Sequence, residues 1–418
     1  NFTGNITANN QIGIVADGGT INAMGASTIT VQNGGIGAYV KNAAPAFGTT
    51  TIAVQGGNAS KYSMGVYYDG VSSIGTAPTI TQTGSYTIGM VLNNSIGTTA
   101  GGISIGGAGI TNQVGVMAKG NSNLTVAGTV TVSGGNNNIG VYGENSIITA
   151  NNNITVAAPS SSDPLDPMKY SSIGIYMNKG SYIGTGNVSV GNNSIGIYGK
   201  DLNGGSISQT GTVMTVGNSG VGIYGTGTGN GTENINLTMT TGITLGNNNS
   251  IGVYAKNINS SVTGDMYVGT NTSIGIVSEG NGNVTYSGDL TIEDKGIGVN
   301  DTGSVGIYKL DGTGTVNVLA GNWNVGNNGY GIFLKQAAEQ SATINNNADM
   351  TLETAAVGIF SSGKNIVNNI GDITVGKTDV NGDHNNTQGH LNSVGMYISG
   401  GTVATSSGII TVNHDHSV

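Results

Sequence analysis

Short runs in which apolar and polar residues alternate recur along the whole chain of 418 residues. Examples are Val-Thr-Val at 130–132, Ile-Thr-Val at 154–156 and Ile-Thr-Val at 373–375. A period of two is the pattern of a β-strand, and no apolar spacing of i, i+3, i+4 and i+7 persists anywhere, which excludes helical repeats. The pattern therefore predicts an all-β chain of many short strands.

A second phrase, close to Ser-[Ile/Val]-Gly-[Ile/Val/Met]-Tyr, repeats at intervals that run from 22 residues (Gly174 to Gly196) to 37 residues (Gly358 to Gly395). Each interval contains one alternating run, and many contain a weaker third run such as 124–126 or 316–318. Three strands per interval, separated by Gly and Asn clusters, describe one coil of a right-handed parallel β-helix (β-solenoid). The fifteen phrase glycines, which predict about fifteen coils, are Gly13, Gly37, Gly65, Gly89, Gly115, Gly140, Gly174, Gly196, Gly222, Gly252, Gly275, Gly306, Gly331, Gly358 and Gly395.

The repeat predicts one continuous β-helix over residues 1–418, with excursions at about 158–170 and 376–392. Residues 5–7 already have the character of a strand, and Ser417-Val418 begin another phrase, so we expect a segment cut from a longer rod.

Strict alternation within the phrase places the Ile and Val that flank each glycine in the core, and the glycine and tyrosine together on the outer face. We interpret the glycines as structural, in particular Gly140, Gly174, Gly196, Gly222, Gly252, Gly275 and Gly306. Asparagine clusters, as at 247–249 and 345–347, are expected at the corners, where Asn tolerates left-handed backbone angles and bonds along a stack.

Composition narrows the possible functions. Glycine contributes 75 residues, whereas phenylalanine contributes four and tryptophan one, which predicts a thin core filled by Ile and Val rather than by aromatic side chains. The twelve basic residues are all lysines and face 21 carboxylates, so the net charge of −9 argues against nucleic acid as a partner. Cysteine is absent from the sequence, and no segment has the pattern of a signal peptide or a membrane-spanning helix.

The phrases at 194–198, 250–254 and 304–308, set in sequence rich in asparagine and free of arginine, resemble the passenger domains of the very large fusobacterial autotransporter adhesins, the RadD-like group. The resemblance covers residues 11–418. It implies type V secretion and display on the bacterial cell surface, outside the outer membrane, with attachment only through a C-terminal β-barrel that this segment does not contain. The partners it implies are the surface of another bacterium, a host-cell receptor protein or a surface glycan.

Two alternatives to an adhesive segment remain open. One is a passive stalk that presents a distal adhesive tip. The other is a polysaccharide-degrading enzyme, because parallel β-helices also house such activities. An enzyme of that kind needs clustered carboxylates on adjacent coils. The acids here are scattered, so we expect no catalytic residue.

An aromatic ladder is the first candidate for binding. The residue two positions after the phrase glycine is aromatic in most coils: Tyr39, Tyr67, Tyr142, Tyr176, Tyr198, Tyr224, Tyr254, Tyr308, Phe333, Phe360 and Tyr397. Stacked identical residues stabilise a solenoid laterally, which is the simpler interpretation. The functional alternative is a strip for sugar rings or receptor side chains, with Tyr176, Tyr198, Tyr224 and Tyr254 as the contact residues.

The longest interval contains a candidate cation loop. Oxygen-bearing side chains occupy alternate positions at Asp379, Asn381, Asp383 and Asn385, the spacing by which an acidic loop wraps calcium. His384 stands where such a loop needs glycine, and His390 stands where it needs a bidentate glutamate, so a polar turn-rich loop is the alternative. No other cofactor is predicted.

The four histidines, His384, His390, His414 and His416, follow the second strand of the last two coils. Histidines brought together in this way can bind zinc or respond to mild acid, and a solvated corner is the simpler interpretation.

The excursion at 158–170 carries three of the five prolines and interrupts the usual corner sequence. Proline cannot donate to a strand ladder, so the chain must leave the coil here. Loops that leave a rigid scaffold often carry binding specificity, and Leu165, Met168 and Tyr170 are the candidate contact residues.

We predict that replacing residues 159–169 by a Gly-Asn-Asn-Ser corner leaves the fold intact and abolishes whatever adhesion this segment supports. The repeats on both sides are complete, so the excursion is not needed to propagate the ladder. Circular dichroism tests the fold, and binding of the purified segment to bacterial and host cells tests the adhesion. Undiminished binding by the shortened chain would contradict the prediction.

Overall fold

The computed structural model describes residues 4–22, 26–74, 77–161, 170–229, 231–293, 303–337, 340–376 and 393–413. These residues form 41 β-strands and no helix, and the strands pair in parallel with those of the neighbouring coils. The predicted all-β parallel solenoid with three short strands per coil is confirmed. The described residues contain no helix that is long and apolar enough to span a membrane.

The chain divides into two compact units, Asn1–Thr210 and Gly211–Val418, and each unit has three ladders of stacked strands. We call these ladders faces A, B and C, in the order in which a coil passes through them. Face A carries the glycine phrase, face B the third, weaker run, and face C the alternating run such as Val-Thr-Val at 130–132.

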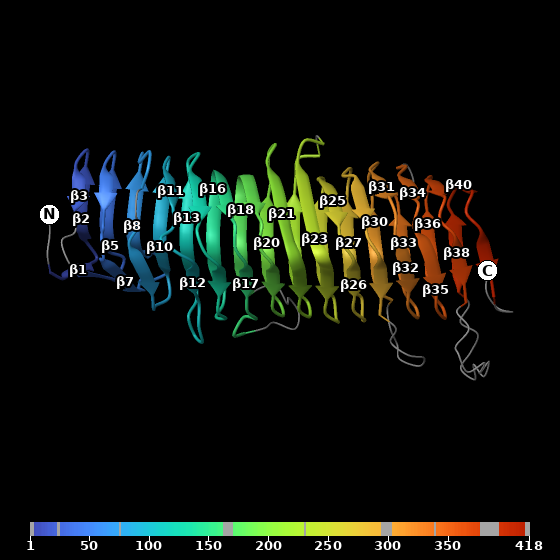
Figure 1. Ribbon diagram of the computed structural model, residues 1–418, viewed down its shortest axis with the longest axis horizontal. Helices are drawn as coiled ribbons and strands as arrows, with labels where there is room; N and C mark the ends of the chain where they lie inside the picture. Colours follow the sequence, from blue (N-terminus) through green and yellow to red (C-terminus); the bar gives the residue numbers. More distant parts are fainter. Residues whose placement is uncertain are drawn as a thin grey trace. The chain divides into compact units, whose positions relative to one another are not determined.

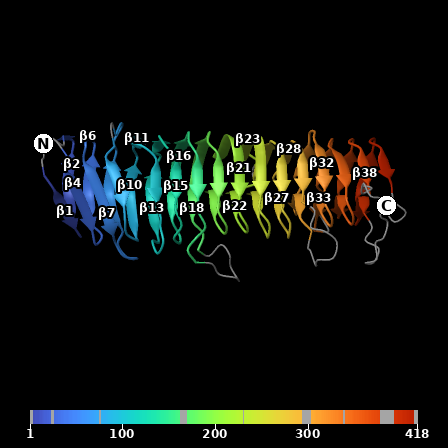
Figure 2. The same cartoon turned by 60° about the horizontal axis from the view of Figure 1, so that its bottom comes forward.

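Unit 1 has eight strands on face A, which lie side by side in Figure 1. They are β2 (Ile12–Asp17), β5 (Ile36–Lys41), β8 (Ser63–Asp69), β10 (Thr87–Asn93), β13 (Gln113–Lys119), β16 (Ile139–Ala150), β18 (Ile173–Gly184) and β20 (Ile195–Lys200). Face B is formed by β3 (Thr20–Asn22), β6 (Ala44–Ala46), β11 (Ile96–Thr98), β14 (Asn123–Val126), the second halves of β16 and β18, and the start of β21 (Ser206–Val216). Face C, part of which Figure 2 shows, is formed by β1 (Ile6–Asn9), β4 (Thr28–Gln32), β7 (Thr51–Gly56), β9 (Thr79–Gln82), β12 (Ile103–Ile105), β15 (Val130–Val132), β17 (Ile154–Val156) and β19 (Val188–Val190).

Unit 2 repeats the arrangement. Face A is formed by β22 (Val221–Thr226), β24 (Ile251–Lys256), β27 (Ile274–Glu279), β30 (Val305–Leu310), β33 (Tyr330–Lys335), β36 (Val357–Ser362) and β39 (Val394–Ser399). Face B is formed by the start of β23 (Asn234–Leu245), β25 (Asn259–Thr263), β28 (Val284–Ser287), β31 (Thr315–Val318), β34 (Thr343–Asn346), β37 (Ile366–Asn369) and β40 (Val403–Ser406). Face C is formed by the ends of β21 and β23 and by β26 (Met266–Val268), β29 (Leu290–Ile292), β32 (Asn322–Val325), β35 (Asp349–Leu352), β38 (Ile373–Val375) and β41 (Ile410–Val412).

The two units together make about 13 turns, slightly fewer than the predicted number of about fifteen. Within the described part of the chain, the first and last strands of face C are β1, which pairs with β4, and β41, which pairs with β38.

The core is lined by the inward side chains of the three faces, mostly Ile and Val with no measurable exposure. Contrary to the prediction, large aromatic side chains are buried there as well: Tyr68, Tyr182, Tyr286 and Trp323. Tyr182 fits because residue 184 is glycine: a Cβ atom there would lie 2.1 Å from the Tyr182 hydroxyl oxygen. That hydroxyl donates to Gln209 Oε1 at 2.8 Å. The Tyr286 hydroxyl donates to the Asp289 carbonyl at 2.8 Å.

The phrase glycines face the core, which corrects the expectation that they share the outer face with the tyrosines. A Cβ atom on Gly174 would lie 2.5 Å from Ile154 Cγ2, in the core, and 2.7 Å from the Gly196 carbonyl oxygen. The same clash with the carbonyl of the next phrase glycine, at 2.7 Å or less, recurs at every phrase glycine that has a successor in its own unit. Each coil therefore approaches the next more closely than any side chain would allow.

This close approach breaks the alternation at the start of the phrase. The glycine and the residue after it both face inward, and the residue before the glycine faces outward. Strand β24 shows this, because Gly252, Val253 and Ala255 are buried, whereas Ile251, Tyr254 and Lys256 are half-buried. The prediction was correct for the Ile or Val after the glycine and wrong for the one before it.

The corners are rich in asparagine, as predicted. Of the 22 non-glycine residues with positive φ in the described chain, 15 are asparagines. Asparagine side chains also bond along the stack, but within the strands of face B: Asn345 Nδ2 donates to Asn317 Oδ1 at 2.8 Å, and Asn368 Nδ2 donates to Asn345 Oδ1 at 2.9 Å. Asn345 and Asn346 belong to β34, so the prediction of a corner at 345–347 was wrong for these two residues. Such ladders satisfy polar groups from coil to coil.

We predict that Gly174→Ala lowers the free energy of unfolding by about 1–3 kcal/mol, because the new methyl group would overlap a backbone carbonyl that cannot move independently of the ladder. Gly19→Ala is the matched control, since a Cβ atom there meets nothing within 4 Å. Urea denaturation followed by circular dichroism measures both variants. Equal stabilities for the two would contradict the inward placement of the phrase glycines.

Candidate functional site

The outer surface of face A carries two parallel apolar rows in each unit. The first row is the residue before each phrase glycine, and the second is the residue two positions after it. We call the second row the aromatic strip. In unit 1, strand register aligns it as Val15, Tyr39, Tyr67, Val91, Met117, Tyr142, Tyr176 and Tyr198. In unit 2 it is Tyr224, Tyr254, Val277, Tyr308, Phe333, Phe360 and Tyr397.

The two rows pack against each other in the middle of unit 1. Ile88 and Val114 of the first row and Val91 of the aromatic strip are buried, although all three lie on the outer face. They are covered by partly buried neighbours, among them Tyr67 and Met117. The outside of face A is therefore a layer of packed apolar side chains, two residues wide on each strand.

Most rings of the aromatic strip stack face to face. The ring centroids of Tyr142 and Tyr176 are 5.1 Å apart with an interplanar angle of 5°, and those of Tyr224 and Tyr254 are 4.6 Å apart at 2°. Phe360 stacks on Phe333 at 4.4 Å. These separations are close to the spacing of adjacent strands, so the ladder imposes the stack.

Stacking determines which part of each ring a partner can reach. Within a run such as Tyr142 and Tyr176, the ring faces that meet are covered by the stack. A sugar ring or receptor side chain would therefore meet ring edges rather than these aromatic faces. Tyr397, in the last coil that the structure describes, is 47% exposed.

Charged groups border the strip in unit 2. The Tyr254 hydroxyl donates to Glu279 Oε2, and Lys256 Nζ lies 2.6 Å from Glu279 Oε1. The hydrogen bonds from Lys256 and Tyr254 lower the pKa of the Glu279 carboxyl, while burial and the bond to Glu279 raise the pKa of the Tyr254 hydroxyl. The hydroxyl thus stays protonated at neutral pH and donates to Glu279.

Burial raises the pKa of Tyr176 to about 12, and the neighbouring tyrosines Tyr198 and Tyr142 add to the effect. Charged groups also border the strip in unit 1: Lys119 Nζ lies 5.4 Å from the centre of the Tyr67 ring, and the Tyr39 hydroxyl donates to Asp69 Oδ2 at 2.9 Å. A partner that docks on the strip therefore meets apolar contacts with charged groups beside them.

The structure places the predicted contact residues as follows. Tyr176 lies in the strip of unit 1 and stacks on Tyr198, whereas Tyr224 and Tyr254 lie together in unit 2. Tyr170 is half-buried, and its carbonyl accepts a bond of 3.3 Å from the Asn137 amide. Leu165 and Met168 lie outside the described residues.

The candidate calcium loop, with Asp379, Asn381, Asp383 and Asn385, also lies outside the described residues, as do all four histidines. Over the ranges that the structure covers, no three His, Asp or Glu side chains are arranged to hold a metal ion.

Sequence reasoning missed a buried cation in unit 2. Lys309 has no measurable exposure, and its Nζ donates to the carbonyls of Gly280 and Gly282, the latter at 3.3 Å, and to Ser278 Oγ at 3.4 Å. Burial lowers the pKa of this ammonium group to about 8, and Asp311 opposes the shift. The signal was present in the sequence, because other phrases end in an apolar residue followed by lysine, as in Ala255-Lys256, whereas this one ends in Lys309-Leu310.

No protein-family model, no curated protein and no solved structure matches the chain.

We predict that the stability of unit 2 rises by about 1 kcal/mol between pH 7 and pH 9, below the pH at which unfolded tyrosines ionise. An unfolded lysine keeps its proton up to its ordinary pKa of 10.5, whereas folded Lys309 releases its proton from about pH 8. The unfolded chain therefore binds more protons in this window, and the free energy of unfolding increases with pH. The single tryptophan, Trp323, is buried in unit 2, so its fluorescence during urea unfolding reports the change.

Lys309→Met should remove this rise, and Lys335→Met, at an exposed outward position of β33, should retain it. A flat pH profile in the wild-type chain, or an unchanged rise in Lys309→Met, would show that Lys309 does not titrate from the core.

Proposed function

We propose that this chain is a segment of a surface-displayed autotransporter adhesin passenger, a rigid rod that mediates attachment to other bacteria or to host-cell receptors by non-covalent binding. Display outside the outer membrane and type V secretion belong to the same proposal. Its support is the β-solenoid fold together with the repeated phrase that resembles the RadD-like group.

The observation that carries the binding role is the double apolar row on the outer surface of face A. Its members, such as Ile139, Tyr142, Ile173 and Tyr176, are half-buried by their own neighbours, and each keeps an outward edge. An apolar layer that continues from strand to strand suits a large receptor protein or a surface glycan better than a small ion.

A passive stalk is the second candidate, and one observation favours it. The rings of the strip are stacked with interplanar angles of 2° to 6° at Tyr224–Tyr254 and Phe333–Phe360, so they already contribute to lateral stability. If that were their whole role, the aromatic strip would support a distant tip and bind nothing itself.

We predict that the double variant Tyr142→Thr and Tyr176→Thr retains the fold and loses at least about tenfold in binding to the cells or glycans recognised by the intact segment. Threonine preserves strand propensity, and the loss of the ring stack should cost about 0.5–1.5 kcal/mol per pair. A glycan array and a cell-binding assay with the purified chain first identify the target.

Thr155→Ala with Ser189→Ala is the matched control, because both residues are exposed on the outer side of face C in the same unit. Full binding by the tyrosine variant would shift the contact to the excursion at 158–170. Absence of binding by the intact segment would favour the stalk.

A further inference from the structure

The face C ladder of unit 1 is interrupted between two consecutive coils. β9 pairs with β7, and β12 pairs with β15, but among the described residues no ladder pair joins β9 to β12. On the same two coils the face A ladder is intact, since β10 pairs with β8 on one side and with β13 on the other. Face B is also joined, because the Ile96 amide donates to the Val71 carbonyl at 2.9 Å.

The interruption leaves two parallel strand edges facing each other across an opening. Ile80 of β9 is half-buried, although its ladder neighbours Ile29 and Ile52 are completely buried. An inward side chain that is partly exposed shows that the core is accessible here. Unpaired edges of this kind are the usual templates for an added strand.

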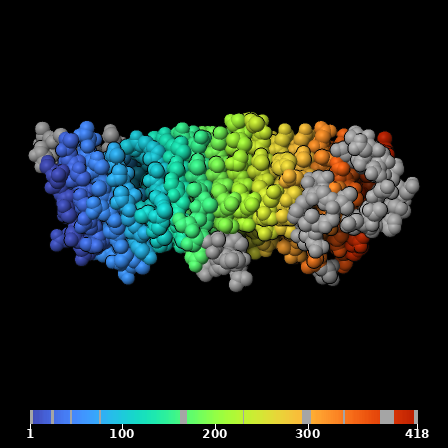
Figure 3. All heavy atoms as spheres, turned by 90° about the horizontal axis from the view of Figure 1, so that it is seen from below, coloured from blue at the N-terminus to red at the C-terminus, as the bar shows by residue number. Residues whose placement is uncertain are grey.

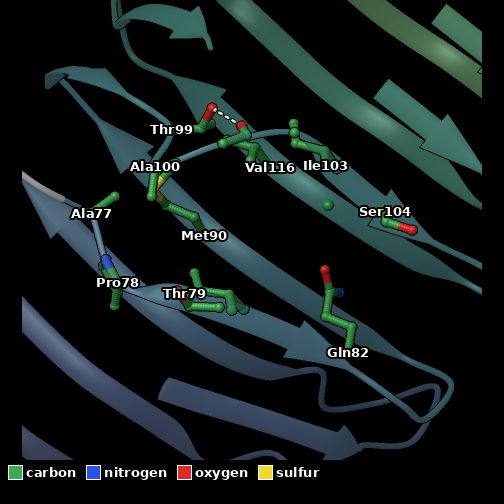
Figure 4. A pocket seen from close by; sticks show the side chains of 14 residues that line it. Ala77, Pro78, Thr79, Gln82, Met90, Thr99, Ala100, Ile103, Ser104 and Val116 are labelled. Atoms are coloured by element: carbon green, nitrogen blue, oxygen red, sulfur yellow. Dashed lines mark hydrogen bonds between the residues drawn. The ribbon is translucent and has the colours of Figure 1, made fainter. Parts of the chain in front are cut away.

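A pocket of about 210 Å³ occupies the opening. Figure 4 shows Thr79 and Gln82 on one side of it and Ile103 and Ser104 on the other, and Figure 3 shows this part of unit 1 hollowed. Met90 and Val116 also line it, and they belong to face A, so the pocket reaches from the outside of face C through the core. None of its fourteen lining residues is charged.

One end of the opening is already bridged by an amide group. The Gly106 amide, just after β12, donates to Gln113 Oε1 at 2.7 Å, and Gln113 Nε2 donates to the Gly84 carbonyl, just after β9, at 2.7 Å. Gln113 is completely buried, so this bridge is fixed. A side-chain amide has the same donor and acceptor as a peptide group, and the opening at this point is therefore one peptide group wide.

We propose that the opening between β9 and β12 binds an extended, uncharged peptide segment of another protein, which pairs with one or both strand edges and continues the bridging begun by the Gln113 amide. Its inward side chains are small or aliphatic, to fit against Met90 and Val116, and its outward side chains are polar. A charged segment is disfavoured, because no lining residue would compensate a charge in the core. This role goes beyond the proposed adhesion and does not depend on it.

The probe is an acetylated and amidated peptide that copies residues 128–134, Gly-Thr-Val-Thr-Val-Ser-Gly, and therefore has the alternation of β15. Added to the full chain, it should bind saturably and slow hydrogen exchange at the amides of β9 and β12. The same peptide N-methylated at each of its five inner residues keeps the side chains but lacks ladder donors on both edges, so it should bind at least about tenfold more weakly.

Ala100→Trp places a bulky side chain at the rim from an exposed position, and it should weaken peptide binding at least about tenfold without altering the circular dichroism spectrum. Ala127→Trp is the matched control, because Ala127 is exposed at the same place one coil later, where β12 and β15 are paired.

Three results would overturn the proposal: no binding of the parent peptide, equal binding of the N-methylated peptide, or an equal loss in Ala127→Trp. If Ala100→Trp were misfolded, the comparison of the two peptides would still decide. Binding of a neutral oligosaccharide in place of the peptide, with no change in exchange at β9 and β12, would assign the pocket to a different ligand class.

Discussion

The close approach of successive glycine backbones along face A is the constraint on which the rest of the structure depends. A Cβ atom at Gly252, for example, would lie 2.6 Å from the Gly275 carbonyl oxygen, a distance that no side chain could accept. Because the glycine carries no side chain, the residue after it can also face inward, and the strand changes phase at this point. The residue before the glycine then shares the outer face with the tyrosine. One steric requirement thus accounts for both the repeat and the two-row apolar exterior.

The same narrow core explains how polar groups are accommodated. The ladders between coils use most backbone carbonyl groups of the strands. A buried polar side chain must therefore bond to a carbonyl group where the chain turns. Lys309 donates to the carbonyls of Gly280 and Gly282, and Gln113 donates to the carbonyl of Gly84 beside the interrupted ladder. Asn346 and Asn369 bond to each other, with Asn346 Nδ2 donating to Asn369 Oδ1 at 2.8 Å, and each also donates to a carbonyl of the next turn, that of Ala348 or Gly371. Each of these groups is buried and bonded, which is what a low-dielectric interior requires.

Periodicity was sufficient to predict the fold, because period-two runs, Gly and Asn corners and a recurring phrase all indicate the same coil. It did not predict the phase change at the glycine, since alternation alone contains no information on how closely two backbones approach. The tyrosine positions and their stacking followed from the spacing, because identical residues one coil apart lie side by side in the ladder. Lys309 and the opening at β9 are each a departure from the repeat in a single coil. The repeats vary so much from coil to coil that one such departure cannot be told from ordinary variation in the sequence. The excursion and the candidate calcium loop remain predictions.

The interrupted ladder shows how a solenoid can carry a site without losing its architecture. Each coil is held to the next by three ladders, and interactions in such a protein are confined to nearest neighbours. Where β9 and β12 separate, the pairs β8–β10 and β10–β13 continue on face A, and Ile96 remains bonded to Val71 on face B. The face A ladder and the backbone hydrogen bonds of face B hold the two coils together, so face C is free to open into the core. A globular domain that opened its core to this extent would lose packing on every side, whereas here the cost is confined to a few residues of one face.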